Sequence, residues 1–251
     1  MHTYLAGVRH LHIVSGCPNP LDKALRLQLA LRGYKGNKPP KPNPRLPHIL
    51  RAIKAVLLRA PQDYDNTLLW AALCLGFFGF LRSGEFVVKS QSTFNPKQHI
   101  TPQDIAVDSH SNPTLIRVFI KQSKADQFGN GAHIFLSRTD TDLCPVAVLL
   151  AYLAQRPNSG KGPLFVKRDG SPLTKPMLVD MLHNALRCAG IDPTYYKGHS
   201  FRIGAATTAA ALGIQDSLIQ KMGRWSSAAF LAYIRTPHTE LASVSKTLGQ
   251  A

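Results

Sequence analysis

Three residues of the chain, His199, Arg202 and Tyr233, could act together on a phosphate. His199 and Arg202 are three positions apart, so both project from the first turn of a helix that begins at Ser200. The free backbone N–H groups and the dipole at such a helix start favour an anion, and an imidazole and a guanidinium suit it to a phosphate. Tyr233, on a later predicted helix, carries a hydroxyl that could attack that phosphate. Each residue alone is more often an ordinary helix residue, so the hypothesis depends on their combination.

An excess of positive charge indicates a polyanionic partner. The 251 residues hold 30 Lys and Arg against 14 Asp and Glu, which gives a net charge of +16. The excess is strongest in residues 1–60, where eleven Lys and Arg stand against one acid, Asp22. Such a charge favours nucleic acid first and an anionic membrane surface second. Because charge supplies affinity but no chemistry, the candidate residues above must supply the reaction.

The cysteines and histidines indicate neither a disulfide framework nor a metal site. The four cysteines are far apart and form no Cys-x-x-Cys pair, which predicts free thiols in a reducing, intracellular compartment. The ten histidines form no His-x3-His or His-Glu-x-x-His pattern, so we expect no metal and no cofactor. The longest apolar run, residues 68–81, is too short to cross a bilayer. We therefore expect a soluble protein that does not bind a membrane.

Residues 1–47 divide into a helical part and a linker. Two helical patterns fill residues 1–33, with a Gly- and Pro-rich break at 16–20. Because two short helices cannot bury their apolar faces alone, we expect the end of an α-helical domain whose beginning is absent. Residues 34–47 are a basic, proline-rich linker, which is either a stiff spacer or a strap across a phosphate backbone, or both. The basic side chains assigned to DNA contact are Lys35, Lys38, Lys41, Arg45, Arg51, Lys121 and Arg235.

Residues 48–251 are predicted to be α+β and mainly α, a helical bundle with a small antiparallel sheet. We expect a helix at 47–60 and then a second helix capped by Asp65 or Asn66. The second helix is apolar almost all round through Phe80, so it should be central to the core. Strands are expected at 105–107, 115–120 and 132–136, the last two joined by a long hairpin tip with a Gly-Asn-Gly turn. Further expected elements are a short strand at 163–166 and helices at 145–155, 174–188, 198–211, 215–222, 226–235 and 239–247.

Three separated motifs stand in one order along this basic chain. They are Gly79-Phe-Leu-Arg82-Ser-Gly-Glu85, His199-Ser-Phe-Arg202 and Gly223-Arg-Trp-Ser-Ser-Ala-Ala-Phe-Leu-Ala-Tyr233. Their order and spacing resemble the tyrosine recombinase (integrase) family, specifically the eukaryotic branch carried by Crypton and DIRS-like mobile elements. A lone His-x-x-Arg is a weak signal, whereas three motifs in order are a specific one. The resemblance covers about residues 45–237 and implies a catalytic domain at 48–251, preceded by the remnant of a DNA-clamping core-binding domain.

The resemblance implies cleavage and rejoining of DNA without metal or ATP. Tyr233 would be the nucleophile, and it would leave a 3′-phosphotyrosyl link and a free 5′-hydroxyl. Arg82 and Arg202 would each offer a forked pair of donors to nonbridging phosphate oxygens. His199 would accept or share the phenol proton, and Lys124 on the hairpin would protonate the leaving 5′ oxygen.

The third motif departs from the family pattern. In the family a His or Trp lies nine residues before the nucleophile, and here Arg224 stands at that place while Trp225 lies eight before Tyr233. Either Arg224 supplies the hydrogen bond, or a one-residue helical adjustment brings Trp225 into the site. A purely structural role for Trp225 would be packing against the Tyr233 helix.

Two further assignments carry alternatives. The hairpin offers Lys121 as well as Lys124, and the sequence around Lys124, Ser-Lys-Ala-Asp, matches the family pattern better. On a hairpin edge such lysines also serve to prevent aggregation. Glu85 would hold either His199 or Arg82 in position, as the resemblance implies.

The implied partner is double-stranded DNA, with a monomer when free and a homotetramer on two duplexes. A nuclear location follows from the same resemblance. One alternative is a non-catalytic DNA-binding relic or domesticated module, which would hold duplexes without cutting them. A second alternative is a type IB topoisomerase, which shares the chemistry but acts as a monomer.

Overall fold

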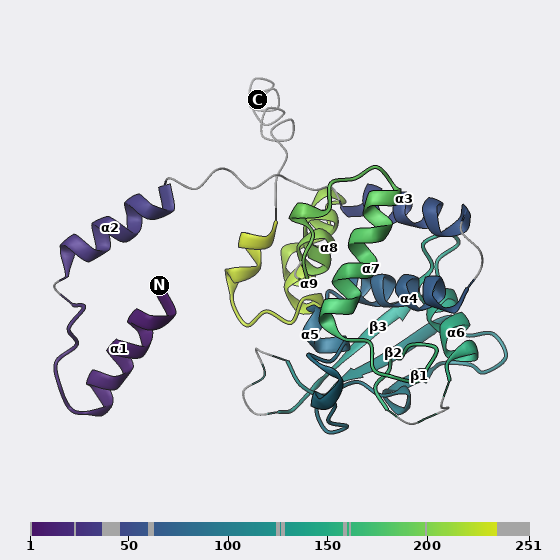
Figure 1. The fold of residues 1–251 in the computed structure, drawn as a ribbon, viewed down its shortest axis with the longest axis horizontal. Coiled ribbons are helices and arrows are strands. Elements are labelled where there is room, and N and C mark those ends of the chain that lie inside the picture. Colours follow the sequence, from purple (N-terminus) through teal and green to yellow (C-terminus); the bar gives the residue numbers. More distant parts are fainter. Residues whose placement is uncertain are drawn as a thin grey trace, which may run out of the picture. The chain divides into compact units, whose positions relative to one another are not determined.

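The computed structural model describes residues 2–22, 24–36, 46–59, 63–123, 126, 129–157, 160, 162–198 and 200–234. The chain divides into two compact units, Met1–Pro42 and Asn43–Ala251 (Figure 1). The division falls inside the linker predicted at 34–47.

The first unit consists of two helices, α1 (His2–Val14) and α2 (Leu25–Gly36). The predicted helices are therefore confirmed, although α2 extends three residues into the predicted linker. Large apolar side chains of both helices are exposed, among them Tyr4, Leu11 and Leu25. The two helices thus do not bury their apolar faces, as the sequence predicts.

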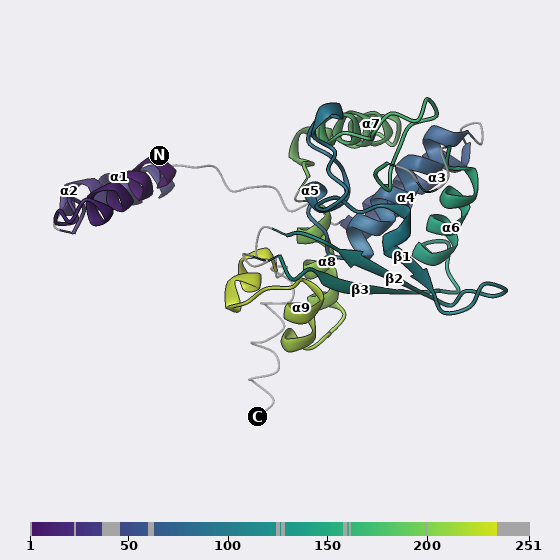
Figure 2. The same cartoon turned by 90° about the horizontal axis from the view of Figure 1, so that it is seen from below.

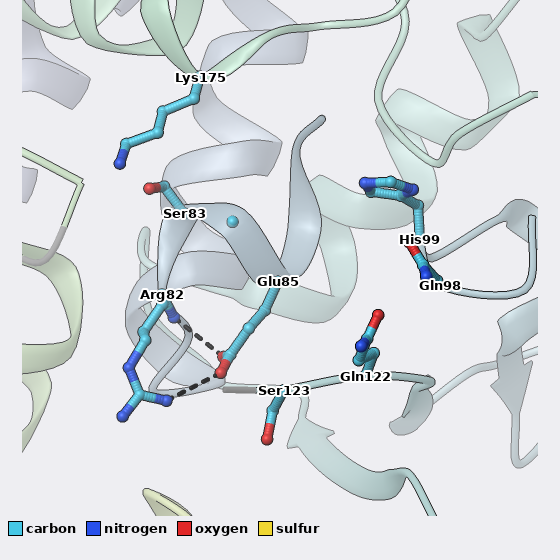
Figure 3. A pocket seen from close by; sticks show the side chains of 9 residues that line it. Arg82, Ser83, Glu85, Gln98, His99, Gln122, Ser123 and Lys175 are labelled. Atoms are coloured by element: carbon cyan, nitrogen blue, oxygen red, sulfur yellow. Dashed lines mark hydrogen bonds and ion pairs between the residues drawn. The ribbon is translucent and has the colours of Figure 1, made fainter. Parts of the chain in front are cut away.

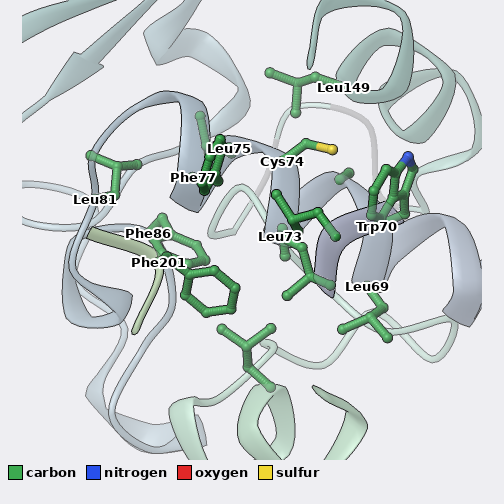
Figure 4. Close-up of a cluster of buried hydrophobic side chains, with 14 of the residues drawn as sticks. Leu69, Trp70, Leu73, Cys74, Leu75, Phe77, Leu81, Phe86, Leu149 and Phe201 are labelled. Carbon is green, nitrogen blue, oxygen red and sulfur yellow. The ribbon is translucent and has the colours of Figure 1, made fainter. Parts of the chain in front are cut away.

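The second unit is built around α4 (Tyr64–Phe78), whose residues 68–75 are all buried (Figure 4). This helix packs against α6 (Pro145–Gln155) and α8 (Ser200–Ala211), and also contacts α3 (Leu46–Arg59) and α7 (Lys175–Cys188). The predicted cap was wrong. Asp63 caps the helix because its carboxylate accepts the Asn66 N–H at 2.7 Å, and the helix ends at Phe78 because Phe80 turns to a positive φ of 52°.

The three predicted strands form one antiparallel sheet in the order β1-β2-β3, with β1 (Ile105–Val107), β2 (Leu115–Ile120) and β3 (Ala132–Ser137). Ile116 faces Leu136 and Val118 faces Ile134, and these four side chains line the buried face. Figure 2 shows the strands side by side along one side of the helices, where β3 contacts α6. The mainly helical fold with a small antiparallel sheet is thus confirmed.

The remaining elements are short. They are α5 (Ser83–Phe86), α9 (Asp216–Met222) and the 3₁₀ helices η1 (Gln91–Thr93), η2 (Pro102–Asp104), η3 (Pro193–Tyr195) and η4 (Ala228–Tyr233). The strand predicted at 163–166 was wrong, because that segment forms only an isolated bridge between Val166 and Pro172. The α-helix predicted at 226–235 is the 3₁₀ helix η4, a tighter turn that buries Phe230. The helix predicted at 239–247 lies outside the described residues.

A glycine of α4 brings two of the motifs together. A Cβ on Gly76 would lie 3.1 Å from the Phe86 ring of α5, which is a tight contact, and 3.5 Å from the Phe201 ring of α8, so the glycine lets both rings pack closely on α4. The turn that carries Arg82 and the helix that carries Arg202 therefore pack at the same point of α4. None of the helices in the described ranges is both long and apolar enough for a membrane span.

Candidate active site

Glu85 is a buried carboxylate held between two arginines. Its oxygens accept the backbone N–H of Arg82 at 3.0 Å and the Nη1 of the same arginine at 3.1 Å. On the other side, Nη2 of Arg224 lies 2.8 Å from Glu85 Oε2. Charge-assisted bonds of this kind fix geometry as well as charge. The expected contact between Glu85 and Arg82 is present, and Arg224 is a partner that the sequence did not predict for Glu85.

Two arginines also bind the C-terminal end of α4. Arg224 donates to the Gly79 carbonyl at 3.2 Å, and Arg202 donates to the neighbouring Phe80 carbonyl at 3.0 Å. These carbonyls lie in the turn just past the last residue of α4, near the negative end of the helix dipole, so cations are favourable there. Arg202 also donates to the Gly223 carbonyl. All three sequence motifs therefore meet at one place.

Trp225 covers Arg202. Arg202 is fully buried at 0% exposure, and its guanidinium carbon lies 4.0 Å from the centre of the Trp225 ring, which is a cation–π contact. The same ring lies 6.0 Å from the Phe230 ring of η4, so Trp225 also has the packing role expected of it. A side chain at Gly223 would overlap the Trp225 ring, which explains the glycine before this pair.

Backbone strain is concentrated at this cluster. Within the described ranges, Phe80 (φ 52°) and Arg224 (φ 55°) are the two non-glycine residues with positive φ. Such a conformation costs about 1–2 kcal/mol for a residue with a side chain. Both residues stand where a chain segment reverses to present a carbonyl or a guanidinium to the cluster. Strain of this kind typically marks functional sites.

The Arg224 side chain is 14% exposed, and this burial affects its charge. Burial lowers the pKa of the Arg224 guanidinium, Glu85 opposes this effect, and Arg82 adds to it by repulsion. An arginine nevertheless remains protonated in a protein. The cluster has three guanidiniums, two of them on Glu85 and the third on backbone carbonyls, so with one carboxylate it is positive overall.

Arg82 reaches the surface, whereas Arg202 does not. The Arg82 side chain is 18% exposed and borders a pocket of about 330 Å³ (Figure 3). The pocket walls come from the start of α5, the loop before η2, the chain after β2 and the start of α7. Its lining includes Arg82, Ser83, Gln98, His99, Ser123 and Lys175. Of the two motif arginines, only Arg82 is placed to meet a ligand in this state.

Several predicted site residues lie outside the described residues. They are Lys124, His199, Arg235, Lys38, Lys41 and Arg45, together with the side chains of Lys35 and Tyr233. The backbone around two of them is described. The Gly198 carbonyl accepts the Ser83 N–H at 3.2 Å, which ties the segment before α8 to the first motif. The 3₁₀ helix η4, which ends at Tyr233, packs on α8.

The other predicted basic residues take different places. Lys121 forms an ion pair with Asp104 at 2.6 Å and donates to the Pro96 carbonyl at 2.8 Å, so its ammonium is held at the base of the hairpin. Arg51 is exposed on α3. The structure adds His99 and Lys175 to the pocket, neither of which the sequence indicated. The contact that brings Lys175 there, the bridge between Val88 and Thr174, leaves no signal in a single sequence.

The comparisons with known proteins agree with the fold. The chain is similar in structure to the XerH site-specific recombinase, solved with its palindromic difH substrate after cleavage, with a TM-score of 0.57 and 16% identity over 78% of this chain and 50% of that one. XerA recombinase gives the same TM-score and identity over 84% of this chain and 64% of that one. The fold is that of a tyrosine recombinase catalytic domain.

The sequence comparison supports the tyrosine recombinase/integrase family as well. The chain is 28% identical over 164 residues to an integrase/recombinase XerD homolog from Selenomonas ruminantium, a match that covers 62% of this chain and 43% of the relative. No protein-family model matches the chain. The chain spans about half the length of the first relatives that it matches.

Proposed function

We propose that the chain binds duplex DNA and cleaves and rejoins one strand through a covalent phosphotyrosine. The observation that carries this proposal is the meeting of three motifs around Glu85 and the end of α4. DNA affinity alone needs positive charge on a surface and has no use for a buried carboxylate that orients an arginine at a pocket. Phosphoryl transfer does need such preorganised charge.

The proposed reaction is a displacement at the phosphorus atom of the DNA backbone. The Tyr233 phenol oxygen forms a bond to the phosphorus, and the bond from phosphorus to the 5′ oxygen breaks. His199 takes the phenol proton, and Lys124 gives a proton to the leaving 5′ oxygen. Attack of a 5′-hydroxyl on the phosphotyrosine reverses each transfer, so the step needs neither metal nor ATP.

Arg82 and Arg202 enter this scheme differently. Arg82 is already positioned by Glu85 beside the pocket, where it would bind a nonbridging oxygen. Arg202 would reach the phosphate only if Trp225, which covers it, moves away. Because Trp225 also contacts η4, we infer that DNA binding shifts η4, and with it the backbone of Tyr233.

We also propose the branch of the family, the location in the cell and the oligomeric state on DNA. The order and spacing of the three motifs support the Crypton and DIRS-like branch of mobile elements and hence a nuclear location. On the pattern of that family, a homotetramer would hold two duplexes and each subunit would cut one strand. The net charge of +16 supports DNA as the partner.

One observation favours a second candidate, a non-catalytic DNA-binding module. Arg202 is fully buried and its guanidinium donates to two backbone carbonyls. If this arrangement persists on DNA, the chain would bind duplexes without cutting them.

Trapping of a covalent adduct separates the two candidates. The full chain is incubated with nicked duplexes of random sequence, in which the cleaved fragment diffuses away, and adducts are resolved on denaturing gels. The wild type should give a protein–DNA band that Tyr233→Phe abolishes. Tyr195→Phe is the matched control, because Tyr195 is 51% exposed on η3 and should leave the band intact.

The candidates predict opposite outcomes in this assay. A shift in native gels without any covalent band for the wild type would support the module. A covalent band that persists in Tyr233→Phe would show that another residue is the nucleophile. Recovered adducts can be sequenced, which also reports the preferred target.

A further inference from the structure

Lys175 is the one lysine among the described residues that line the pocket beside Arg82. Lys54, Lys121 and Lys167 each form an ion pair with an aspartate. Lys175 is exposed, and no acidic side chain in the described part of the chain lies within ion-pair distance of its ammonium. An ammonium without a counter-charge at the edge of a pocket is available to an anionic ligand.

The base of Lys175 is fixed beside the first motif. Its backbone N–H donates to the Val88 carbonyl at 2.9 Å, and Thr174 forms a bridge with Val88, two residues after α5. The Lys175 stem passes over Gly198, where a Cβ would lie 3.2 Å from Cε of the lysine and would overlap the Ser83 hydroxyl. Lys175 and Ser83 therefore converge over the backbone that leads into α8.

The pocket between Lys175 and Arg82 has a net positive charge. Figure 3 shows the Lys175 amino group pointing toward Ser83 on one wall, with His99 and Gln98 on the opposite wall. Glu85 is the one carboxylate in the lining, and it is already shared by two arginines. The lining thus presents two cations from different elements, with the Ser83 hydroxyl between them and amide and imidazole groups on the opposite wall.

The start of α7 offers no backbone donors that would explain such a site by themselves. The Lys175 N–H is used by Val88, Pro176 has no N–H, and the Met177 N–H faces the Thr174 hydroxyl at 3.4 Å. Any anion in the pocket near α7 must therefore be held by the Lys175 side chain. This makes the contribution of that residue testable by a single substitution.

We propose that Lys175 and Ser83 form a second phosphate-binding subsite, which holds a DNA phosphate next to the one that Arg82 binds. The inference rests on the proposed function, because it takes a DNA strand as the ligand that crosses the pocket. Phosphates follow one another closely along a strand, so two cations that line one pocket suit two consecutive phosphates. The subsite would fix the register of the strand before cleavage.

The test is the salt dependence of DNA binding by the full chain. A random-sequence duplex is titrated between about 50 and 200 mM salt, and Lys175→Gln should lower the slope of log affinity against log salt by about one. At the lower salt the affinity should fall roughly tenfold. Lys175→Arg should keep the wild-type slope, because the positive charge remains.

Arg187→Gln is the matched control. Arg187 is exposed at the other end of α7, about 18 Å along the helix axis, which exceeds the screening length of about 10 Å. It removes the same charge from the same helix and should leave the slope unchanged. Equal thermal midpoints for the variants would confirm that the fold is intact, since a glutamine keeps the N–H that binds Val88.

The subsite and the proposed function fail separately. A slope that is unchanged in Lys175→Gln, or that falls equally in Arg187→Gln, overturns the subsite even if the covalent adduct forms. A selective fall without any adduct from the wild type supports the subsite and overturns the cleavage reaction. A wild type that does not bind DNA at all overturns both.

Discussion

Glu85 and Arg224 illustrate how one buried charge fixes the position of another residue. The Glu85 side chain is 4% exposed and holds Arg82 through two contacts, while Arg224 balances its charge from the far side. Arg224 thereby acts on Arg82 through the carboxylate, so it is a positioning residue. We propose that this is the role of the arginine at the place where the resembling family has a His or Trp.

A double-mutant cycle should reveal this coupling. Arg224→Met leaves the buried carboxylate with one partner and should lower the free energy of unfolding by roughly 3 kcal/mol. Combined with Glu85→Gln, the loss should be smaller than the sum of the single losses by about 1–3 kcal/mol. Urea unfolding of the wild type, the two single variants and the double variant measures this difference. As a control, Arg187→Met at an exposed site should change the free energy of unfolding by less than about 0.5 kcal/mol. Strict additivity would show that the two residues do not act as a unit.

At the scale of elements, the sequence predicts what depends on local pattern. Helix α6 begins at Pro145, after the cap Cys144, and α7 begins after the cap Thr174, as expected, because a capping side chain and an early proline mark each start. The hairpin follows from period-two alternation. In contrast, two features of the site depend on more than local pattern. Helix α5 has only four residues and follows the positive φ of Phe80. The contact between Glu85 and Arg224 joins residues 139 positions apart. Neither leaves a local pattern. The pairing of Glu85 with Arg82, three residues apart, could therefore be predicted from the sequence, whereas its pairing with Arg224 could not.

The loop between β1 and β2 provides a pH-dependent element. Asp108 accepts the hydroxyl of Thr114 at 2.5 Å and the N–H groups of Thr114 and Leu115 at 2.9 and 3.0 Å, and these bonds, the hydroxyl first, lower the pKa of Asp108 to about 2. Because the folded pKa lies below the unfolded value of about 3.9, the stabilisation is complete above that value and is lost as the pH falls toward about 2.

Thermal unfolding from about pH 2 to 7 tests this stabilisation, because this range covers the Asp108 pKa of the folded and of the unfolded chain. Asp108→Ala should unfold at a lower temperature than the wild type near neutrality, and the difference should shrink as the pH approaches 2. Asp142→Ala is the control, because the Asp142 side chain is 90% exposed and accepts one ion pair. A constant difference across the range would mean that the Asp108 charge does not matter.

At the scale of the whole molecule, the buried core and the densest positive charge lie in different parts of the chain. Among the described residues, the buried core runs from Ile49 to Phe230, entirely within the second unit. Residues 1–42 contain seven Lys and Arg and one acid, and their helices expose apolar side chains. The core should therefore fold without the first unit, whereas DNA binding should depend on it.

Deletion of residues 1–42 should separate these two properties. The fragment 43–251 should unfold cooperatively, with a midpoint close to that of the full chain, because no buried core residue is removed. Its DNA affinity should fall, and the salt slope should decrease by about 2 or more, since each lost phosphate contact contributes about 0.9. A full chain with Lys35, Lys38 and Lys41 changed to Gln loses positive charge but keeps residues 1–42. We expect this variant to reproduce most of the decrease in the salt slope. If the fragment binds DNA with the salt slope of the full chain, the DNA-binding charge lies in the second unit alone. If the fragment does not unfold cooperatively, the two units do not fold independently.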